Sequence, residues 1–445
     1  MWSPNARDLG GLPTRYGVPT RERALFRSES LDDLEADGRA AFDAVGAGLV
    51  LDLRSDGEIR QPHLLDGSSS YQRIPWIDPV ADAARDASAE AGIADIYRGS
   101  LTRNKEHIAR AFRAVAEAPA DRPVVVHCRA GKDRTGLMIA ILLDLVGVPR
   151  AVIAEDYALS EARLGLQNGP EMSRSRPETI LASLDHLDRE YGGVRGYLTW
   201  CGLTQAEIHR LATRLMPVDV RAVVFDFDGL LMDTETTMVE SWRAEWAHHG
   251  LELELEEFWP GHGGDITEDR YAILAAAVGS GFDRAASHAR RTAHRNAMHQ
   301  DLDFRPGIRE WVMTARELGL KVAIASSSPR PWVQGHLERV DAVELFDLVV
   351  TGDEVEAHKP DPAIYLLALR RLGVPGDEAI AVEDTAHGVA AAQAAGMVAV
   401  AIPNPFVDAV AVAAADLVLG SADEVLLSEL LLSVGSKGVD RAVTE

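Results

Sequence analysis

The residues best suited to chemistry lie in the segment His-Cys-Arg-Ala-Gly-Lys-Asp-Arg-Thr-Gly at 127–136. It follows the apolar run 123–126, so we expect a short buried strand, a loop and then a helix. Backbone N–H groups of such a loop, and the positive end of the helix, would face an anion. The same surroundings favour the thiolate form of Cys128 near neutral pH. Arg134 offers a planar fork that matches two phosphate oxygens, and Thr135 can hydrogen-bond the departing sulfur.

This loop predicts a phosphate cradle with a thiol nucleophile at its floor. Cys128 would attack phosphorus in line, and water would then hydrolyse the phosphocysteine. We expect His127 to orient the loop through hydrogen bonds and not to act as a base. A buried structural cysteine is the alternative, which the order of residue types disfavours. The further phosphate-binding positions of the cradle are Arg129, Ala130, Gly131, Lys132, Asp133 and Thr135.

The loop resembles the Cys-x5-Arg signature of protein tyrosine phosphatases. Together with the segments 5–11, 25–28 and 50–54, it is similar to a bacterial tyrosine/lipid phosphatase family over roughly residues 1–200. These segments disfavour a rhodanese or an arsenate reductase, which also use Cys-x5-Arg. The resemblance implies hydrolysis of phosphotyrosine. Lys132 resembles the lysine of the Gly-Lys-x-Arg pattern in phosphoinositide phosphatases, so a phosphoinositide is an alternative substrate.

A general acid must protonate the leaving oxygen of the substrate. We expect this acid to be Asp78, in a proline-flanked loop after the strand predicted at 71–74, because the family places its acid there. Asp82 and Asp133 are the alternatives. A solvated turn residue is the other interpretation of Asp78.

A second set of reactive residues follows in the same chain. The apolar strand predicted at 222–227 leads into Asp226 and Asp228, and period-two alternation sends both carboxylates to the same side. Two carboxylates there can hold Mg²⁺, while one attacks phosphorus and the other moves protons. Three further motifs follow in order: Ser326 and Ser327 at the end of strand 321–326, Lys359 before a helix, and Glu383 and Asp384 at the end of strand 379–383.

These four motifs, in this order, resemble those of the haloacid dehalogenase superfamily. The resemblance implies that Asp226 is the nucleophile and Asp228 the general acid/base. The other roles that it implies are Mg²⁺ ligation by Asp226, Asp384 and the backbone carbonyl of Asp228, with Glu383 nearby, and phosphate binding by Ser326, Ser327 and Lys359.

A helical pattern at about 236–303 interrupts the second domain after its first strand, where the superfamily inserts a cap. Its expected packing positions are Trp242, Trp246, Tyr271 and Ile273. Asp-Thr-Glu at 233–235 resembles the β-phosphoglucomutase-like branch. Met238, however, stands where that mutase has a functional His. We therefore expect hydrolysis of a small phosphorylated metabolite, with a phosphomutase as the alternative.

The length of 445 residues predicts two or three domains, and 47% hydrophobic residues suffice for two cores. Strands alternate with helices in both halves, which predicts two α/β domains. The first would be tyrosine-phosphatase-like, and the second a Rossmann-like haloacid dehalogenase domain with a helical cap. A Thr-x-x-Glu capping box at 204–207 begins the last helix of the first domain, and Pro217 ends it. The predicted boundaries are domain 1–216, linker 217–220, domain 221–433 and flexible tail 434–445.

The net charge of −24 disfavours nucleic acid and anionic membranes as partners. We find no signal segment, and the longest apolar stretch, 137–148, is too short to span a bilayer. Two cysteines cannot form a disulfide framework. We interpret Cys201 as structural, with a resolving partner for oxidised Cys128 as the alternative. We expect a cytoplasmic protein without stable membrane association.

The sequence therefore predicts a bifunctional phosphatase with two independent sites. The thiol site needs no cofactor, and the second site needs Mg²⁺. The expected partners are phosphorylated small molecules, with phosphoproteins or phosphoinositides as further candidates. The competing hypothesis is that one domain is a non-catalytic phosphate-binding or regulatory module.

Overall fold

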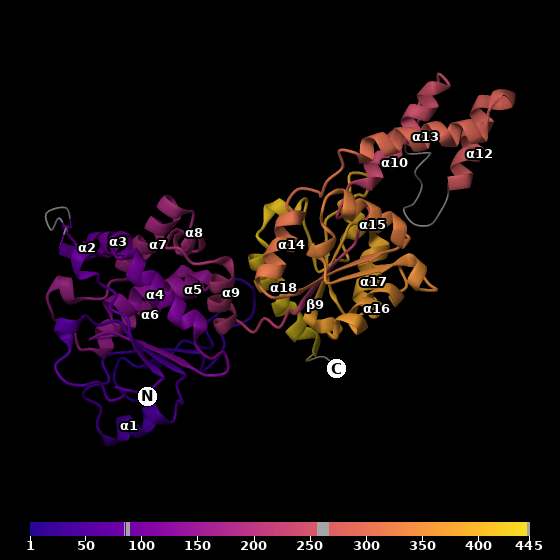
Figure 1. Cartoon of the computed structure of the whole chain (residues 1–445). Helices are drawn as coiled ribbons and strands as arrows, with labels where there is room; N and C mark the ends of the chain where they lie inside the picture. The colour runs from indigo at the N-terminus through magenta and orange to yellow at the C-terminus, as the bar shows by residue number, and fades with distance from the viewer. Residues whose placement is uncertain (84, 86–89, 256–266, 443–445) are drawn as a thin grey trace. The chain divides into compact units, whose positions relative to one another are not determined.

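A computed structural model describes residues 1–83, 85, 90–255 and 267–442 of the chain (Figure 1). The chain divides into two units, Met1–Val218 and Asp219–Glu445. Each unit is built around its own largely parallel β-sheet, so the predicted two-domain α/β fold is confirmed. Across the described ranges, no helix is both long and apolar enough to cross a membrane.

The sheet of the first unit has the strand order β1-β2-β5-β3-β4. β1 and β2 pair antiparallel, and the other neighbours pair parallel. The central strand β5 is buried along its whole length, as its unbroken apolar run predicts for a strand covered on both faces. The strands are β1 (Arg7–Asp8), β2 (Leu25–Ser28), β3 (Leu49–Asp52), β4 (Tyr71–Arg73) and β5 (Val124–His127).

Helices cover this sheet and anchor the loop that follows β5. α1 packs on one face, where Phe42 shares a buried core with Phe26 and Val125. α5 begins immediately after the loop and is buried along most of its length, which fixes the loop between strand and helix. The described α-helices of this unit are α1 (Ala36–Asp43), α2 (Pro79–Ala83), α3 (Ile93–Arg103), α4 (Lys105–Glu117), α5 (Asp133–Leu145), α6 (Arg150–Arg163), α7 (Pro177–Tyr191), α8 (Val194–Trp200) and α9 (Gln205–Leu215).

The second unit contains a parallel sheet with the order β11-β10-β9-β6-β7-β8. Alternate residues of β6 enter different cores: Val223 and Phe225 pack on one face, and Ala222 and Val224 on the other. The carboxyl ends of β6, β7 and β9 lie side by side, which is where such sheets bind ligands. The strands are β6 (Ala222–Phe225), β7 (Lys321–Ser326), β8 (Leu348–Thr351), β9 (Ala379–Glu383), β10 (Val398–Ala401) and β11 (Leu417–Val418).

Helices lie on both faces of the second sheet. Leu430 of α18 packs in the core with Val223, and Tyr365 of α16 packs in the core with Val224. α18 continues through most of the segment 434–445, for which we expect a flexible tail, and residues 443–445 lie outside the described ranges. These core helices are α14 (Ile308–Glu317), α15 (Arg330–Arg339), α16 (Ala363–Leu372), α17 (Ala386–Ala394) and α18 (Leu427–Ala442).

Three described helices are inserted between β6 and β7 and form a separate bundle (Figure 1). Trp242, Tyr271 and Leu274 form its buried core. Ile273 is 44% exposed, contrary to our expectation, because Tyr271 and Leu274 define the inward side of their helix and Ile273 lies off it. Residues 256–266 of the predicted cap lie outside the described ranges. The helices are α10 (Thr234–His248), α12 (Thr267–Val278) and α13 (Arg284–His299).

Candidate active sites

The loop between β5 and α5 brings a buried thiol to the carboxyl end of the central strand. The Cys128 side chain is almost completely buried. Gly131 has φ +66°, and a Cβ there would lie 2.2 Å from the carbonyl oxygen of Ser28, so only glycine fits. The carbonyl oxygens of Ala130 and Gly131 accept hydrogen bonds from Asn5 and Arg27, at 2.8 Å and 2.7 Å. The backbone of the loop is therefore fixed by neighbours on β2 and the N-terminal segment.

Arg134 is held in a two-pronged ion pair with Glu58. Its Nη1 and Nη2 atoms donate to the two carboxylate oxygens at 2.5 Å and 2.7 Å. Burial alone would raise the pKa of Glu58, but the hydrogen bonds from Arg134 and from the Ser55 backbone lower it. Sequence reasoning missed Glu58, although Ser-x-x-Glu at 55–58 is a capping-box signal, and the structure contains that box.

Lys132 and Asp133 form an ion pair, and each also contacts other groups. The Lys132 ammonium donates to the carbonyl oxygens of Ser173 and Arg174, at 2.8 Å and 3.3 Å, and lies 3.1 Å from Asp133 Oδ1. The Tyr97 hydroxyl donates to the same Oδ1 at 2.5 Å. Asp133 is nevertheless 43% exposed, so its carboxylate is held in place and remains accessible.

Two other predicted cradle residues lie at the sides of the loop. Arg129 is exposed and lines a cavity of about 730 Å³ beside the loop, together with Glu58 and Arg54. Thr135 is fully buried, and within the described residues its hydroxyl has no hydrogen-bond partner. That hydroxyl is therefore available to a neighbouring sulfur.

Asp78, the expected general acid, caps a helix. Its Oδ1 accepts the backbone N–H groups of Val80 and Ala81, at 2.8 Å and 3.3 Å, in the first turn of α2. These hydrogen bonds lower the pKa of Asp78, which opposes the protonated form that an acid needs. Asp82, the first alternative, lies 3.4 Å from Arg103.

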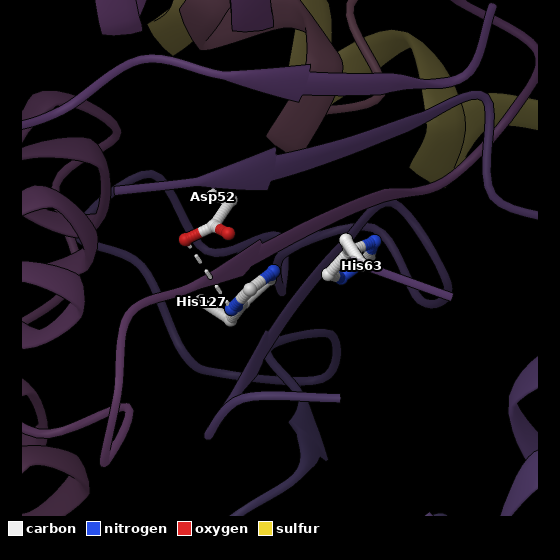
Figure 2. Close-up of side chains that lie close together, drawn as sticks. All are labelled: Asp52, His63 and His127. Carbon is white, nitrogen blue, oxygen red and sulfur yellow. Dashed lines mark ion pairs between the residues drawn. The ribbon is translucent and has the colours of Figure 1, made fainter. Parts of the chain in front are cut away.

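Behind the loop, Asp52, His63 and His127 form a buried cluster (Figure 2). His127 Nδ1 lies 3.1 Å from the carbonyl oxygen of Cys128 and 3.8 Å from Asp52 Oδ1. The His63 ring is nearly parallel to the His127 ring, with centroids 5.4 Å apart. Burial lowers the pKa of His63 to about 4, and it also lowers that of His127. Both rings are therefore neutral supports for the strand end that carries Cys128.

The donor atoms of this cluster lie within 4.8 Å of one another, which is close enough to suggest a metal site. However, Arg54 already binds both oxygens of Asp52, with Nε 3.0 Å from Oδ1 and Nη2 2.8 Å from Oδ2. The Tyr71 hydroxyl donates to Oδ2 as well, at 3.0 Å. The positive charge of Arg54 would repel a metal ion, and both oxygens of Asp52 already accept hydrogen bonds. We therefore interpret the cluster as structural.

A second buried network lies under the same loop. Asp156 accepts from Arg7 Nε at 2.6 Å and from Arg27 Nη1 at 2.5 Å. Burial alone would raise the pKa of Asp156, but the two guanidiniums outweigh this effect and lower it. Because Arg27 also donates to Gly131, Asp156 supports the geometry of the loop from α6. Sequence reasoning did not connect this helix to the loop.

In the second unit, acidic side chains gather at the carboxyl ends of β6 and β9. Carboxylate oxygens of Asp226, Glu383 and Asp384 lie within 4.8 Å of one another, and all three residues are buried. The Lys359 ammonium contacts Asp226 and lies 2.7 Å from Glu383 Oε1. Burial raises the pKa values of Asp226 and Asp384 well above the usual range, and neighbouring carboxylates add to this. A hard divalent cation such as Mg²⁺ fits this crowded oxygen cluster, because it offsets the charge.

The side chain of Asp228 turns toward hydroxyl and indole donors and does not join this cluster. Its Oδ1 accepts from Thr234 Oγ1 and Trp332 Nε1, both at 2.9 Å. Its Oδ2 accepts from Ser328 Oγ at 2.6 Å, while Ser326 Oγ lies 3.4 Å away. Sequence reasoning missed Ser328 and Trp332. Ser327, predicted to bind phosphate, is exposed beside them.

Two further residues hold the acidic cluster in place. Asn404 donates to Asp384 Oδ2 at 2.7 Å. Gly229 has φ +77°, and a Cβ there would lie 2.1 Å from the same oxygen, so glycine is required next to Asp384.

α10 of the cap carries a carboxyl group near Asp228 and a thioether in the packing of the cap. Burial and the neighbouring Asp228 carboxylate raise the pKa of Glu235 to about 7. Met238 packs against the buried core of the cap, with its sulfur 3.5 Å from Arg270 Nη1. Met238, which stands where the mutase has a functional His, thus has a packing role in the cap.

Comparisons with known proteins agree with the two sites. The family model described as tyrosine phosphatase family matches residues 3–217, and that described as haloacid dehalogenase-like hydrolase matches residues 223–402. The chain therefore belongs to both families, one in each half, and it is a phosphoric monoester hydrolase.

Two relatives and one solved structure are among the matches. The chain is 36% identical to YhcW of Bacillus subtilis over 186 residues, which are 42% of this chain and 84% of that protein. It is 32% identical to a tyrosine-protein phosphatase of Nostoc commune over 220 residues, 43% of this chain and 74% of the relative. A crystal structure of CbbY from Rhodobacter sphaeroides with phosphate is 29% identical and covers 46% of this chain and 96% of its own, with a TM-score of 0.37.

Replacing Asp156 with Ala should destabilise the first unit. The substitution leaves two buried guanidiniums without a counter-charge, which typically costs about 3–5 kcal/mol. The pKa of Asp156 is lower in the folded chain than in the unfolded chain. Its contribution to the free energy of unfolding is therefore complete above the unfolded-state pKa and is lost as the pH falls through the folded-state pKa. Urea unfolding across acidic pH should therefore show a large loss for Asp156→Ala that shrinks toward low pH.

The matched control for this prediction is Asp43→Ala. Asp43 pairs with Arg39 on the surface, with 54% of its side chain exposed, so its loss should change the unfolding free energy by no more than about 0.5 kcal/mol. Equal effects of the two substitutions would contradict the role given to the buried network.

Proposed function

We propose that the chain is a bifunctional phosphatase with two chemically independent sites. The first unit would hydrolyse phosphotyrosine or phosphoinositide monoesters through Cys128. The second would hydrolyse a small phosphorylated metabolite through Asp226 with Mg²⁺. The observation that carries the proposal is that each unit has its own buried nucleophile at a strand end, beside a fixed cation, Arg134 in one and Lys359 in the other. The corresponding domains would be 1–216 and 221–433.

In the first site, the Cys128 thiolate attacks phosphorus and the bond to the leaving oxygen breaks. Backbone N–H groups of the loop and the Arg134 fork stabilise the equatorial oxygens. Water then hydrolyses the phosphocysteine, and Thr135 hydrogen-bonds the sulfur as it leaves. This chemistry needs no cofactor, and the reduced thiol that it requires favours the cytoplasm.

We assign the general acid of this site to Asp133 in preference to Asp78. Asp133 adjoins Arg134 in the loop, is accessible, and is oriented by the Tyr97 hydroxyl. The carboxylate of Asp78 already accepts a hydrogen bond at the N-terminus of α2, and the lowered pKa of Asp78 favours the ionised form. Asp133 would protonate the leaving oxygen in the first step and accept a proton from water in the second.

In the second site, Mg²⁺ held by Asp226, Asp384 and the backbone carbonyl of Asp228 would neutralise the phosphoryl oxygens. The Asp226 carboxylate attacks phosphorus and forms an aspartyl phosphate. Asp228 protonates the leaving oxygen and later takes a proton from the hydrolytic water. Lys359 and Ser326 bind the transferring phosphoryl group, and Glu383 keeps Lys359 in position at 2.7 Å.

Two observations favour hydrolysis of a phosphorylated carbohydrate over a phosphomutase reaction. Met238 packs in the cap, and its thioether cannot take a proton from a second sugar hydroxyl. A relative in Thermotoga maritima, 33% identical over 181 residues and matched over 82% of its length, is described as a phosphorylated carbohydrates phosphatase.

The two activities should separate in a p-nitrophenyl phosphate assay of the full chain. Cys128→Ser removes the only nucleophile of the thiol site, so the EDTA-resistant, vanadate-sensitive rate should disappear. EDTA should abolish the rate that remains in this variant. Metal-independent turnover that survives Cys128→Ser would contradict the thiol mechanism.

Asp133→Asn should slow the EDTA-resistant hydrolysis of phenyl phosphate by roughly 10²–10⁴, the range typical of a lost general acid. Asp78→Asn, the control, should leave this rate close to that of the parent, because a backbone-capping amide replaces a capping carboxylate. A larger loss in Asp78→Asn than in Asp133→Asn would restore Asp78 as the acid.

Asp228→Asn should keep Mg²⁺ binding, because only its backbone carbonyl is a proposed ligand, and should slow turnover by roughly 10²–10⁴. Asp226→Asn should lose both metal affinity and turnover, because it removes the attacking oxygen and a ligand together. Calorimetric Mg²⁺ titration with parallel rate measurements tests this difference. Equal loss of metal affinity in the two variants would show that the roles are wrongly assigned.

A further inference from the structure

The carboxylate of Asp228 is surrounded by donors from three parts of the second unit. Trp332 Nε1 of α15 and Thr234 Oγ1 of α10 both donate to Oδ1 at 2.9 Å. Ser328 Oγ donates to Oδ2 at 2.6 Å, and Ser326 Oγ lies 3.4 Å from the same atom. The two oxygens of one carboxylate therefore meet different kinds of donor.

This difference decides where a proton can reside. An indole N–H can only donate, so the oxygen that it contacts must present a lone pair. The Thr234 hydroxyl accepts from the Gly229 N–H at 3.2 Å and thus directs its own proton toward Oδ1. A serine hydroxyl, in contrast, can rotate and accept a hydrogen bond. The protonated oxygen of a carboxyl group is the weaker acceptor, so these donors favour Oδ2 as the position of the proton when Asp228 is protonated.

Neighbouring rings and a guanidinium fix the indole of Trp332. The His336 ring lies 4.5 Å away at 73°, and the His299 ring of α13 lies 5.3 Å away at 71°. The Arg295 guanidinium lies 5.2 Å from the centre of the indole ring, also from α13. The N–H is thus aimed at Asp228 by packing from both the core and the cap.

We propose that Trp332 is a positioning residue that assigns the transferable proton of Asp228 to Oδ2, on the side of Ser326 and Ser328. This inference rests on the proposed hydrolase function of the second unit. In the first step, the O–H bond at Oδ2 breaks as its proton passes to the leaving oxygen, whose bond to phosphorus breaks at the same time. Trp332 keeps Oδ1 as an acceptor throughout and does not itself exchange a proton.

The test is Trp332→Phe in the full chain, which removes the N–H and keeps an aromatic ring. kcat/KM is measured for p-nitrophenyl phosphate and for phenyl phosphate, as the rate with Mg²⁺ minus the rate in EDTA. p-Nitrophenolate leaves without a proton, whereas phenolate depends on the acid. We expect kcat/KM for phenyl phosphate to fall about 10-fold more than that for p-nitrophenyl phosphate, the effect of one hydrogen bond to a charged group. The ratio of the two values does not depend on the folded fraction of the variant.

Two further variants complete the design. Trp311→Phe is the matched control, because its Nε1 donates to the Val425 carbonyl oxygen at 3.0 Å, away from Asp228, and the ratio should match that of the parent. Thr234→Val removes the other Oδ1 donor and should shift the ratio in the same direction as Trp332→Phe. An unchanged ratio in Trp332→Phe would overturn the inference while leaving the hydrolase function intact. A parent without Mg²⁺-dependent turnover of either ester would overturn both.

Discussion

The second site depends on the buried ammonium of Lys359, which is enclosed by Asp226 and Glu383. Burial alone would lower the pKa of this lysine, but the two carboxylates outweigh burial and raise it. Without that cation, the burial of three acidic side chains at the neighbouring ends of β6 and β9 would cost far more in a low-dielectric interior. The hydroxyl of Tyr365 donates to Glu383 and completes its hydrogen bonding. Lys359 therefore lowers the cost of burying the Asp226 carboxylate, and the charge that remains, together with the raised pKa of Asp226, calls for a further cation such as Mg²⁺.

The first unit meets the same constraint with the signs reversed. There the buried cations are Arg7 and Arg27, and the carboxylate of Asp156 between them makes their burial possible. Arg27 then uses its remaining donors on the backbone of the catalytic loop, at the Gly131 carbonyl oxygen. In both units, ion pairs hold the site in place: they fix the backbone of the catalytic loop in the first and the nucleophile itself in the second.

The sequence predicted the strands that carry the motifs because these strands are covered on both faces and are continuously apolar. β2 was not predicted as a strand, since Arg27 interrupts its apolar pattern and is accommodated through Asp156 and the Gly131 carbonyl oxygen. The motif residues themselves were predictable from local spacing. The supporting residues were not, because their contacts join distant segments: Arg134 to Glu58 across 76 positions, Trp332 to Asp228 across 104, and Arg27 to Asp156 across 129. The capping role of Asp78 was also not predicted, because a carboxylate before a helix has a local task that no motif reveals.

The ion pair between Arg134 and Glu58 also has an entropic consequence. A free arginine side chain would lose up to about 2 kcal/mol of rotamer freedom when it closes on a phosphate. Glu58 has already removed that freedom during folding, since both prongs of the guanidinium are fixed at 2.5 Å and 2.7 Å. The entropic cost of ordering the Arg134 side chain is therefore part of the free energy of folding, and it does not weaken the binding of each substrate molecule. The loop therefore meets every phosphate with the Arg134 side chain already immobilised.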